Sequence, residues 1–190
     1  MSHPFRIMTV CIGNICRSPL AERLLRLHLA AAVEAGRVEI TSAGVRAVVD
    51  HPIDAPAVPE LVRLGGDPEG FAARRLTAEL MEPTDLVLTA TVDVRTDALR
   101  HAPRAMRRTF TFTEFAALCR ELPEVEGESV TDFVARAAAN RGVVQGVDLD
   151  VVDPIGRSAA FHRDIADQID GAVRAIAARL GPMLAAGLAS

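Results

Sequence analysis

The sequence predicts an α/β fold of three layers, in which a four-stranded parallel sheet is flanked by helices. Three observations lead to this class. Four short apolar runs alternate with segments whose apolar residues recur at helical spacing. The chain has 190 residues, enough for one sizeable core. Hydrophobic residues make up 49% and charged residues 24%, as in ordinary globular proteins, and the absence of Trp and Tyr predicts a mainly aliphatic core.

The first part of the chain predicts a strand, a helix and a second strand. Residues 5–10 (FRIMTV) form a short apolar run that is typical of a buried strand. One helix should follow, because Pro19 suits a first helical turn and apolar residues recur at helical spacing until Gly36. Residues 38–41 predict the second strand, which the turn at 42–44 closes.

The middle of the chain predicts two further strands separated by helices. Asp54 is a candidate cap for a short helix that Gly65 and Gly66 end. Residues 85–90 (DLVLTA) predict a third buried strand, and a helix is expected at 93–101. Thr and Phe alternate at 108–112, which predicts an edge strand with one buried face.

The last third of the chain predicts three helices within a single domain of residues 1–190. Thr113 is expected to cap the first of them. Residues 123–150 begin with an acidic loop and continue with an S-x-x-D pattern at Ser129, which predicts a helical insertion. Ser158 is expected to cap the final helix. Its apolar stripe comprises Phe161, Ile165, Ile169, Val173, Ile176 and Leu180.

Composition argues against several classes of protein. The formal charge of −4 and the lack of a basic stripe argue against nucleic-acid binding. No apolar run approaches the roughly 20 residues that span a bilayer, so membrane insertion is not expected. The three Cys do not make up a disulfide framework. They indicate a reducing compartment, and a cytoplasmic location is therefore expected. The five His show no ligand spacing, so no metal is expected.

The loop after the first strand carries the clearest chemical signal. Residues 11–18 read CIGNICRS, a Cys followed by five residues and then Arg-Ser, before a predicted helix. Gly13 and Asn14 tolerate left-handed conformations, so the backbone N–H groups can turn inward and form a cup at the helix N-terminus. Such a cup suits a tetrahedral oxyanion. The predicted phosphate-binding residues are Ile12, Gly13, Asn14, Ile15, Cys16, Arg17 and Ser18.

Three residues would carry the chemistry. The positive surroundings of the cup should favour the thiolate form of Cys11, which makes it a nucleophile, and Ser18 can donate a hydrogen bond to its sulfur. Arg17 is expected at the rim, where its planar fork can clamp two oxygens of the anion. Asp153, stiffened by the following Pro154, is a candidate acid for the leaving oxygen and then a base for water. The simpler alternative is that Cys11 packs in the core and that Asp153 only begins a turn.

With these residues in view, the sequence resembles the low-molecular-weight protein tyrosine phosphatases. The resemblance rests on the loop from Cys11 to Pro19, the turn at 41–44 (TSAG) and Asp153-Pro154. It implies hydrolysis of a phosphate monoester without cofactor, through a phosphocysteine on Cys11. Arg17 would then bind the phosphoryl oxygens, Asp153 would act as acid and base, and Asn14 and Ser42 would brace the loop. A phosphorylated protein or a small aryl phosphate would be the substrate.

Departures from the family pattern leave two classes of substrate as alternatives. Ile155 and the run 47–49 (AVV) stand where the family often has aromatic residues, so a phosphotyrosine ring would rest on aliphatic walls. A sister branch that hydrolyses phosphoarginine typically has Thr where this chain has Ile15. The missing hydroxyl favours an aryl phosphate, with a protein-arginine phosphatase as the alternative.

The remaining cysteines raise two further alternatives. Cys16 is either a buried packing residue or, as the resemblance suggests, the partner of Cys11 in a reversible protective disulfide. An arsenate reductase on this scaffold would need relay cysteines in the middle of the chain, but the sequence has none between Cys16 and Cys119. A phosphate-binding module without activity is disfavoured, because all three catalytic candidates are present. We interpret Cys119 as a packing residue.

Overall fold

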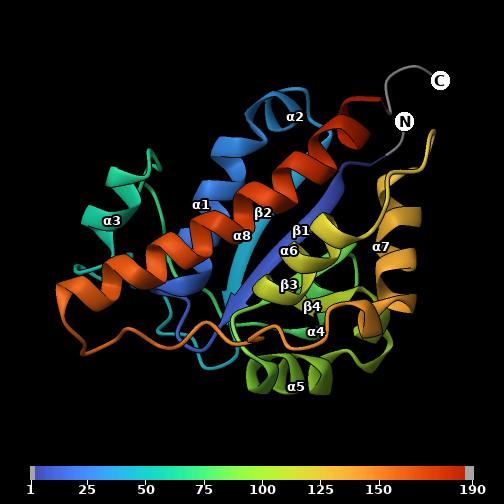
Figure 1. The fold of residues 1–190 in the computed structure, drawn as a ribbon. Coiled ribbons are helices and arrows are strands. Elements are labelled where there is room, and N and C mark those ends of the chain that lie inside the picture. Colours follow the sequence, from blue (N-terminus) through green and yellow to red (C-terminus); the bar gives the residue numbers. More distant parts are fainter. Residues whose placement is uncertain (1–2, 187–190) are drawn as a thin grey trace.

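The computed structural model describes residues 3 to 186 and has an α/β fold with a four-stranded parallel sheet in the order β2-β1-β3-β4 (Figure 1). The strands are β1 (Phe5–Cys11), β2 (Val38–Gly44), β3 (Leu86–Thr89) and β4 (Thr109–Thr111). The predicted fold class is therefore confirmed. β1 and β2 pair in register from Phe5 with Val38 to Cys11 with Gly44, so their carboxyl ends lie together.

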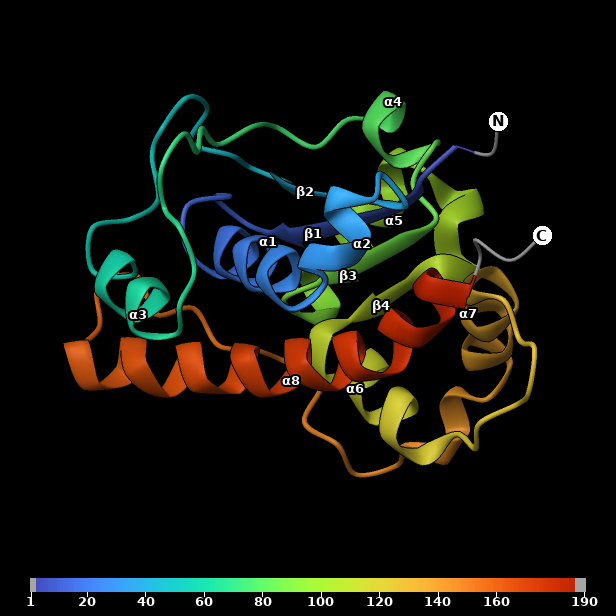
Figure 2. The same cartoon turned by 90° about the horizontal axis from the view of Figure 1, so that it is seen from above.

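Helices cover both faces of the sheet and make the outer two layers (Figure 2). The helices are α1 (Arg17–His28), α2 (Ala30–Glu34), α3 (Val58–Arg63), α4 (Ala78–Met81), α5 (Val92–His101), α6 (Phe112–Glu121), α7 (Val130–Ala139) and α8 (Ala159–Ala186), with 3₁₀ turns η1 (Pro103–Arg108) and η2 (Arg141–Val143). One apolar cluster joins the sheet to α1, α6 and α8, and a smaller one joins the other face to α4 and α5.

Alternation along the central strand explains why its sequence is almost continuously apolar. Phe5 and Ile7 belong to the larger cluster, whereas Met8 and Val10 belong to the smaller one. Successive side chains of a strand point to opposite faces, so a strand covered on both sides must be apolar at nearly every position.

The first predicted helix is in fact two helices, which corrects the expectation of one helix ending at Gly36. α1 ends at His28, and α2 starts after Leu29, whose φ and ψ are −110° and 22°. The break places Leu29 in the core at 3% exposure, whereas Leu27, near the end of α1, is 41% exposed. Burial of Leu29 thus accompanies the change of helix direction.

β4 runs directly into α6, and two details of the prediction were wrong there. Thr111, not Thr113, caps α6, in a capping box with Glu114. All three residues of β4 are buried, although one exposed face was expected. The free edge of β4 is covered by Arg141, which lies 4.1 Å over the ring of Phe110 and donates a hydrogen bond to Thr109 O at 2.7 Å.

The helices expected near the carboxyl end are present with the predicted caps. Ser129 accepts a hydrogen bond from Asp132 N at the start of α7, and Ser158 accepts one from Phe161 N at the start of α8. Phe133 of α7 is fully buried, with its ring 5.9 Å from that of Phe115. No helix in the described part of the chain combines the length and hydropathy of a membrane-spanning segment.

Candidate active site

The loop between β1 and α1, in which the sequence predicts a cup, lies at the carboxyl end of the sheet (Figure 1). Its carbonyl groups point outward, because they accept hydrogen bonds from the segment after β2. The donors are Arg46 N to Ile12 O at 2.9 Å, Val48 N to Gly13 O at 3.0 Å and Asp54 N to Ile15 O at 2.7 Å. Within residues 3–186, the N–H groups of Gly13, Ile15 and Cys16 have no acceptor. Free inward N–H groups are what an anion site requires.

Asn14 holds the shape of the cup. It is fully buried and has a φ of 56°, the left-handed conformation that the sequence predicted for this turn. Its side-chain amide donates to the hydroxyls of Ser18 and Ser42, both at 2.9 Å. Its Oδ1 accepts from Arg74 N at 2.8 Å, and Ser42 in turn donates to Glu22 Oε2 at 2.6 Å. The loop motif and the family resemblance predicted the roles of Asn14 and Ser42, whereas no local sequence pattern marks Glu22 and Arg74.

Gly44 allows β2 to approach the cup. A Cβ atom at this position would lie 2.6 Å from Ile12 O and 2.9 Å from Asn14 N, distances that real side chains do not tolerate. The missing side chain therefore permits the backbone of β2 to support the loop directly.

The sulfur of Cys11 lies at the bottom of the cup. Cys11 is 2% exposed, and its Sγ lies 3.0 Å from Ser18 Oγ and 3.3 Å from Asn14 N. Ser18 Oγ already accepts the Asn14 amide, so its proton is free for the sulfur, and Ala43 O, at 3.5 Å, is the more distant acceptor. Two hydrogen-bond donors are thus directed at the sulfur.

Arg17 brings the loop and Asp153 together. The Arg17 side chain is buried rather than at the rim, which corrects that expectation. One terminal nitrogen donates to Val151 O at 2.9 Å and the other to Asp153 Oδ2 at 2.7 Å. The Asp153 side chain is 41% exposed, and Arg17 Nε is buried without a hydrogen-bond partner within the described residues. A buried, unpaired guanidinium N–H is a donor available to an anion.

Cys16 and Cys119 are free, buried thiols. Burial raises the pKa of Cys16 far above its usual range, and the nearby Cys11 sulfur and Asp54 add to the effect. Cys119 lies on α6, where burial raises its pKa to about 12. Both groups are therefore neutral thiols near pH 7.

Aliphatic side chains are exposed on the segments that flank the cup. The backbone N–H of Val48 donates to Gly13 O of the cup, and Val152 and Ile155 lie on either side of Asp153 and Pro154. The exposed fractions of these aliphatic residues are 46% for Val48, 51% for Val49, 49% for Val152 and 46% for Ile155. A cavity of about 980 Å³ lies elsewhere, where Phe5, Arg37 and Asp85 mark the amino ends of strands.

Comparison with known proteins agrees with this geometry. The family model described as "Low molecular weight phosphotyrosine protein phosphatase" matches residues 6–133. The low molecular weight protein-tyrosine-phosphatase Etp of Escherichia coli K12 is 38% identical over 127 residues, which are 67% of this chain and 81% of Etp.

Solved structures extend the similarity over most of the chain. The tyrosine phosphatase Wzb from Escherichia coli K30, in complex with sulphate, superposes with a TM-score of 0.69 and 26% identity, covering 93% of this chain and 98% of Wzb. The YwlE arginine phosphatase from Geobacillus stearothermophilus superposes with a TM-score of 0.70 and 26% identity, covering 94% of each chain. The sequence match of the family model ends before Asp153, whereas these superpositions include almost the whole fold.

Proposed function

This chain belongs to the low molecular weight phosphotyrosine protein phosphatase family, and from that premise we propose that it hydrolyses phosphotyrosine-like monoesters through a phosphocysteine on Cys11. One observation carries the proposal. A sulfur with two hydrogen-bond donors lies beneath free backbone N–H groups and beside a buried Arg17 whose Nε has no partner within the described residues. Such an arrangement can bind a tetrahedral dianion above a nucleophile.

The first step transfers the phosphoryl group to the enzyme. The Cys11 thiolate attacks phosphorus, the S–P bond forms, and the bond from phosphorus to the leaving oxygen breaks. Asp153 in its acid form gives its proton to that oxygen. Arg17 and the backbone N–H groups stabilise the charge on the three remaining phosphoryl oxygens.

The second step releases phosphate. Water attacks phosphorus, Asp153 takes a proton from it, and the S–P bond breaks to return the thiolate and inorganic phosphate. The ion pair between Arg17 and Asp153 orients both groups before substrate binds. Phosphoryl oxygens in the cup compete with Asp153 for the guanidinium.

Replacement of the nucleophile tests this proposal. We expect Cys11→Ser to abolish phosphate release from aryl phosphates while inorganic phosphate still raises the melting temperature, because the N–H groups and Arg17 remain. Cys119→Ala, which removes a buried thiol elsewhere, should keep the activity. Full activity of Cys11→Ser, or a wild-type protein that releases no phosphate from any ester, would contradict the proposal.

A protein-arginine phosphatase is the second candidate, because the YwlE arginine phosphatase superposes as well as Wzb does. Ile15 supports the aryl substrate, since its side chain offers no hydroxyl to a guanidino group. Parallel assays with phosphotyrosine and phosphoarginine peptides, with arsenate as a control substrate, decide the substrate class. Faster turnover of the phosphoarginine peptide would favour the second candidate.

Three related proposals complete the assignment. We place the enzyme in the cytoplasm, because its three cysteines are free and buried. We keep Cys16 as a candidate redox partner of Cys11, since the two share one loop. We regard residues 123–150 as a helical insertion within a single domain, supported by the packing of Phe133 against Phe115.

A further inference from the structure

The segment that carries Asp153 touches the rest of the molecule at few points. Residues 145–148 are all exposed, and so are residues 155–158. Between these stretches, only Val151 and Pro154 are buried. The position of Asp153 therefore depends on the contacts made by a few residues around it.

Asp150 makes one of these contacts with its side chain. Its Oδ1 accepts a hydrogen bond from Val92 N at 2.8 Å. Val92 is the first residue of α5, and the cap residue Thr91 already accepts from Val94 N. The Asp150 carboxylate thus supplies an acceptor for another N–H group of the first turn, and the helix dipole favours a negative charge there.

The residue after Asp150 fixes the same segment to the sheet and to the cup. Val151 N donates to Ala90 O at 2.8 Å, and Val151 O accepts from Arg17 at 2.9 Å. Ala90 N in turn donates to Val10 O of β1 at 2.8 Å. Asp150 and Val151 together therefore join the acid segment to the carboxyl end of the sheet, three and two residues before Asp153.

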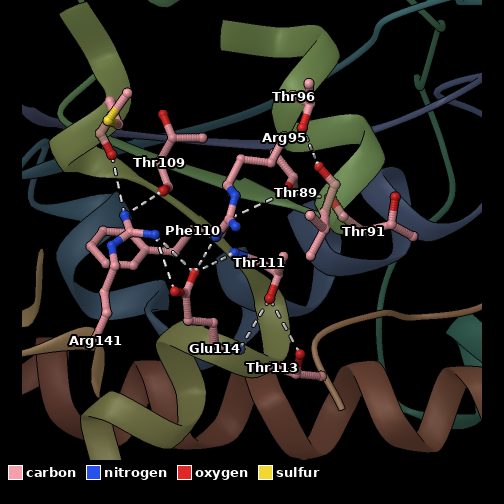
Figure 3. A network of polar contacts seen from close by, with 12 residues as sticks. Thr89, Thr91, Arg95, Thr96, Thr109, Phe110, Thr111, Thr113, Glu114 and Arg141 are labelled. Carbon is pink, nitrogen blue, oxygen red and sulfur yellow. Dashed lines mark hydrogen bonds and ion pairs between the residues drawn. The ribbon is translucent and has the colours of Figure 1, made fainter. Parts of the chain in front are cut away.

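The helix that Asp150 binds is itself held firmly (Figure 3). Arg95 of α5 donates to Glu114 at 2.8 Å, and Arg141 donates to the two oxygens of the same carboxylate at 3.1 and 3.2 Å. Arg141 lies nine residues before Asp150 in the chain. Arg141 therefore holds the chain before the exposed stretch on Glu114 of α6, which also binds Arg95 of α5, and Asp150 holds the chain after that stretch on α5 directly.

From these contacts we infer that Asp150 is a positioning residue for Asp153, holding the acid segment on the first turn of α5. The inference rests on the proposed function, since it concerns the acid of that reaction. The Asp150 side chain makes its hydrogen bond with Val92 N and not with the cup. Its loss should therefore weaken proton transfer to the leaving group and leave oxyanion binding intact.

The test compares Asp150→Ala with a control on the same helix end. Asp93→Ala also removes an acidic residue from the first turn of α5, but the exposed Asp93 makes no hydrogen bond to the acid segment within the described residues. For phenyl phosphate, a poor leaving group, we expect kcat/KM of Asp150→Ala to fall about tenfold, a part of what a general acid contributes. We compare kcat/KM because it covers only the steps up to the first phosphoryl transfer, before Asp153 acts as a base. For 2,4-dinitrophenyl phosphate, and for Asp93→Ala with either substrate, kcat/KM should change less than about twofold.

Two further measurements separate positioning from a loss of folding. In the Asp153→Ala background, Asp150→Ala should cause no additional loss, because the group it positions is gone. Asp150→Asn, which keeps an oxygen acceptor for Val92 N, should restore part of kcat/KM for phenyl phosphate. The inhibition constant of inorganic phosphate should stay within about threefold of wild type in every Asp150 variant.

The inference fails if Asp150→Ala slows both esters equally, or if its loss adds fully to that of Asp153→Ala. These outcomes differ from a failure of the proposed function, in which the wild-type protein would release phosphate from neither ester. Wild-type activity on both esters is therefore the reference for every comparison.

Discussion

At the scale of single residues, Asn14 does the most to shape the cup. It combines a left-handed backbone with a side chain that joins Ser18, Ser42 and the backbone of Arg74. Each of these partners comes from a different segment, so the loop, α1, β2 and the segment after it are joined at one buried amide. A Gly would satisfy the backbone at this position but would provide none of the hydrogen bonds.

Two substitutions of Asn14 separate these contributions. We expect Asn14→Gly and Asn14→Ala each to lower kcat/KM at least tenfold, roughly the effect of losing one or two net hydrogen bonds at the site. Asn14→Ala should also be less stable than Asn14→Gly by about 1 kcal/mol, because a Cβ disfavours the left-handed conformation. Steady-state kinetics and urea unfolding measure the two effects. Equal stability of the two variants would contradict the backbone argument.

At the scale of elements, the junction of β4 and α6 depends on Glu114. Its side chain, 6% exposed, accepts from Arg95, Arg141 and the backbone N–H of Thr111. The same residue therefore completes the capping box of α6 and attaches both α5 and the 3₁₀ turn η2. Arg141 in turn covers the free edge of the sheet at Thr109 and Phe110.

Removal of this carboxylate should destabilise the protein strongly. We expect Glu114→Ala to lower the free energy of unfolding by about 3 kcal/mol, because two partly buried guanidinium groups lose their partner. The exposed pair of Asp97 and Arg100, with side chains 32% and 76% exposed, provides the control. Asp97→Ala should cost less than about 1 kcal/mol. Similar urea midpoints for the two variants would refute the buried-network argument.

At the scale of the whole molecule, the sequence is unusual in its basic residues. All 21 residues counted as Lys or Arg are Arg, and Tyr is absent. Among the side chains, only the three cysteines therefore have ordinary pKa values between about 8 and 11. Burial raises the pKa of Cys119 from 9.0 to about 12, and it raises the pKa of Cys16 as well. Alkaline stability should thus report on these thiols.

The sign of the effect follows from proton binding. Above pH 9 the unfolded chain loses the Cys119 proton, whereas the folded chain keeps it until about pH 12. The unfolded state then binds fewer protons, so the free energy of unfolding is unaffected by Cys119 below pH 9 and falls from pH 9 to 12. In this range, each such thiol lowers the free energy of unfolding by about 1.4 kcal/mol per pH unit. Urea unfolding between pH 8 and 11 should show a shallower slope for Cys119→Ala, and an unchanged slope would contradict the burial argument.

The same scale shows how far the fold could be predicted. The four strands, the caps at Ser129 and Ser158, and the stripe of α8 were predicted correctly, because each is a local pattern of periodicity or hydrogen bonding. The break at Leu29 and the cap at Thr111 were missed, because burial of one side chain and the direct passage of β4 into α6 decide them. That residues 123–150 are an insertion stays a prediction.

The chemistry of the cup was determined by the sequence itself, since eight consecutive residues from Cys11 to Ser18 contain the nucleophile, the flexible turn and the guanidinium. The sequence also named Asp153 as the candidate acid, but only the tertiary structure decided which contacts bring it to the cup: Asp153 reaches Arg17 across 136 positions, and Asp150 reaches Val92 across 58. The reason is physical. Conformational preferences act between near neighbours in the chain, whereas a buried charge or N–H group takes its partner from whatever the packing of the layers brings within hydrogen-bond distance.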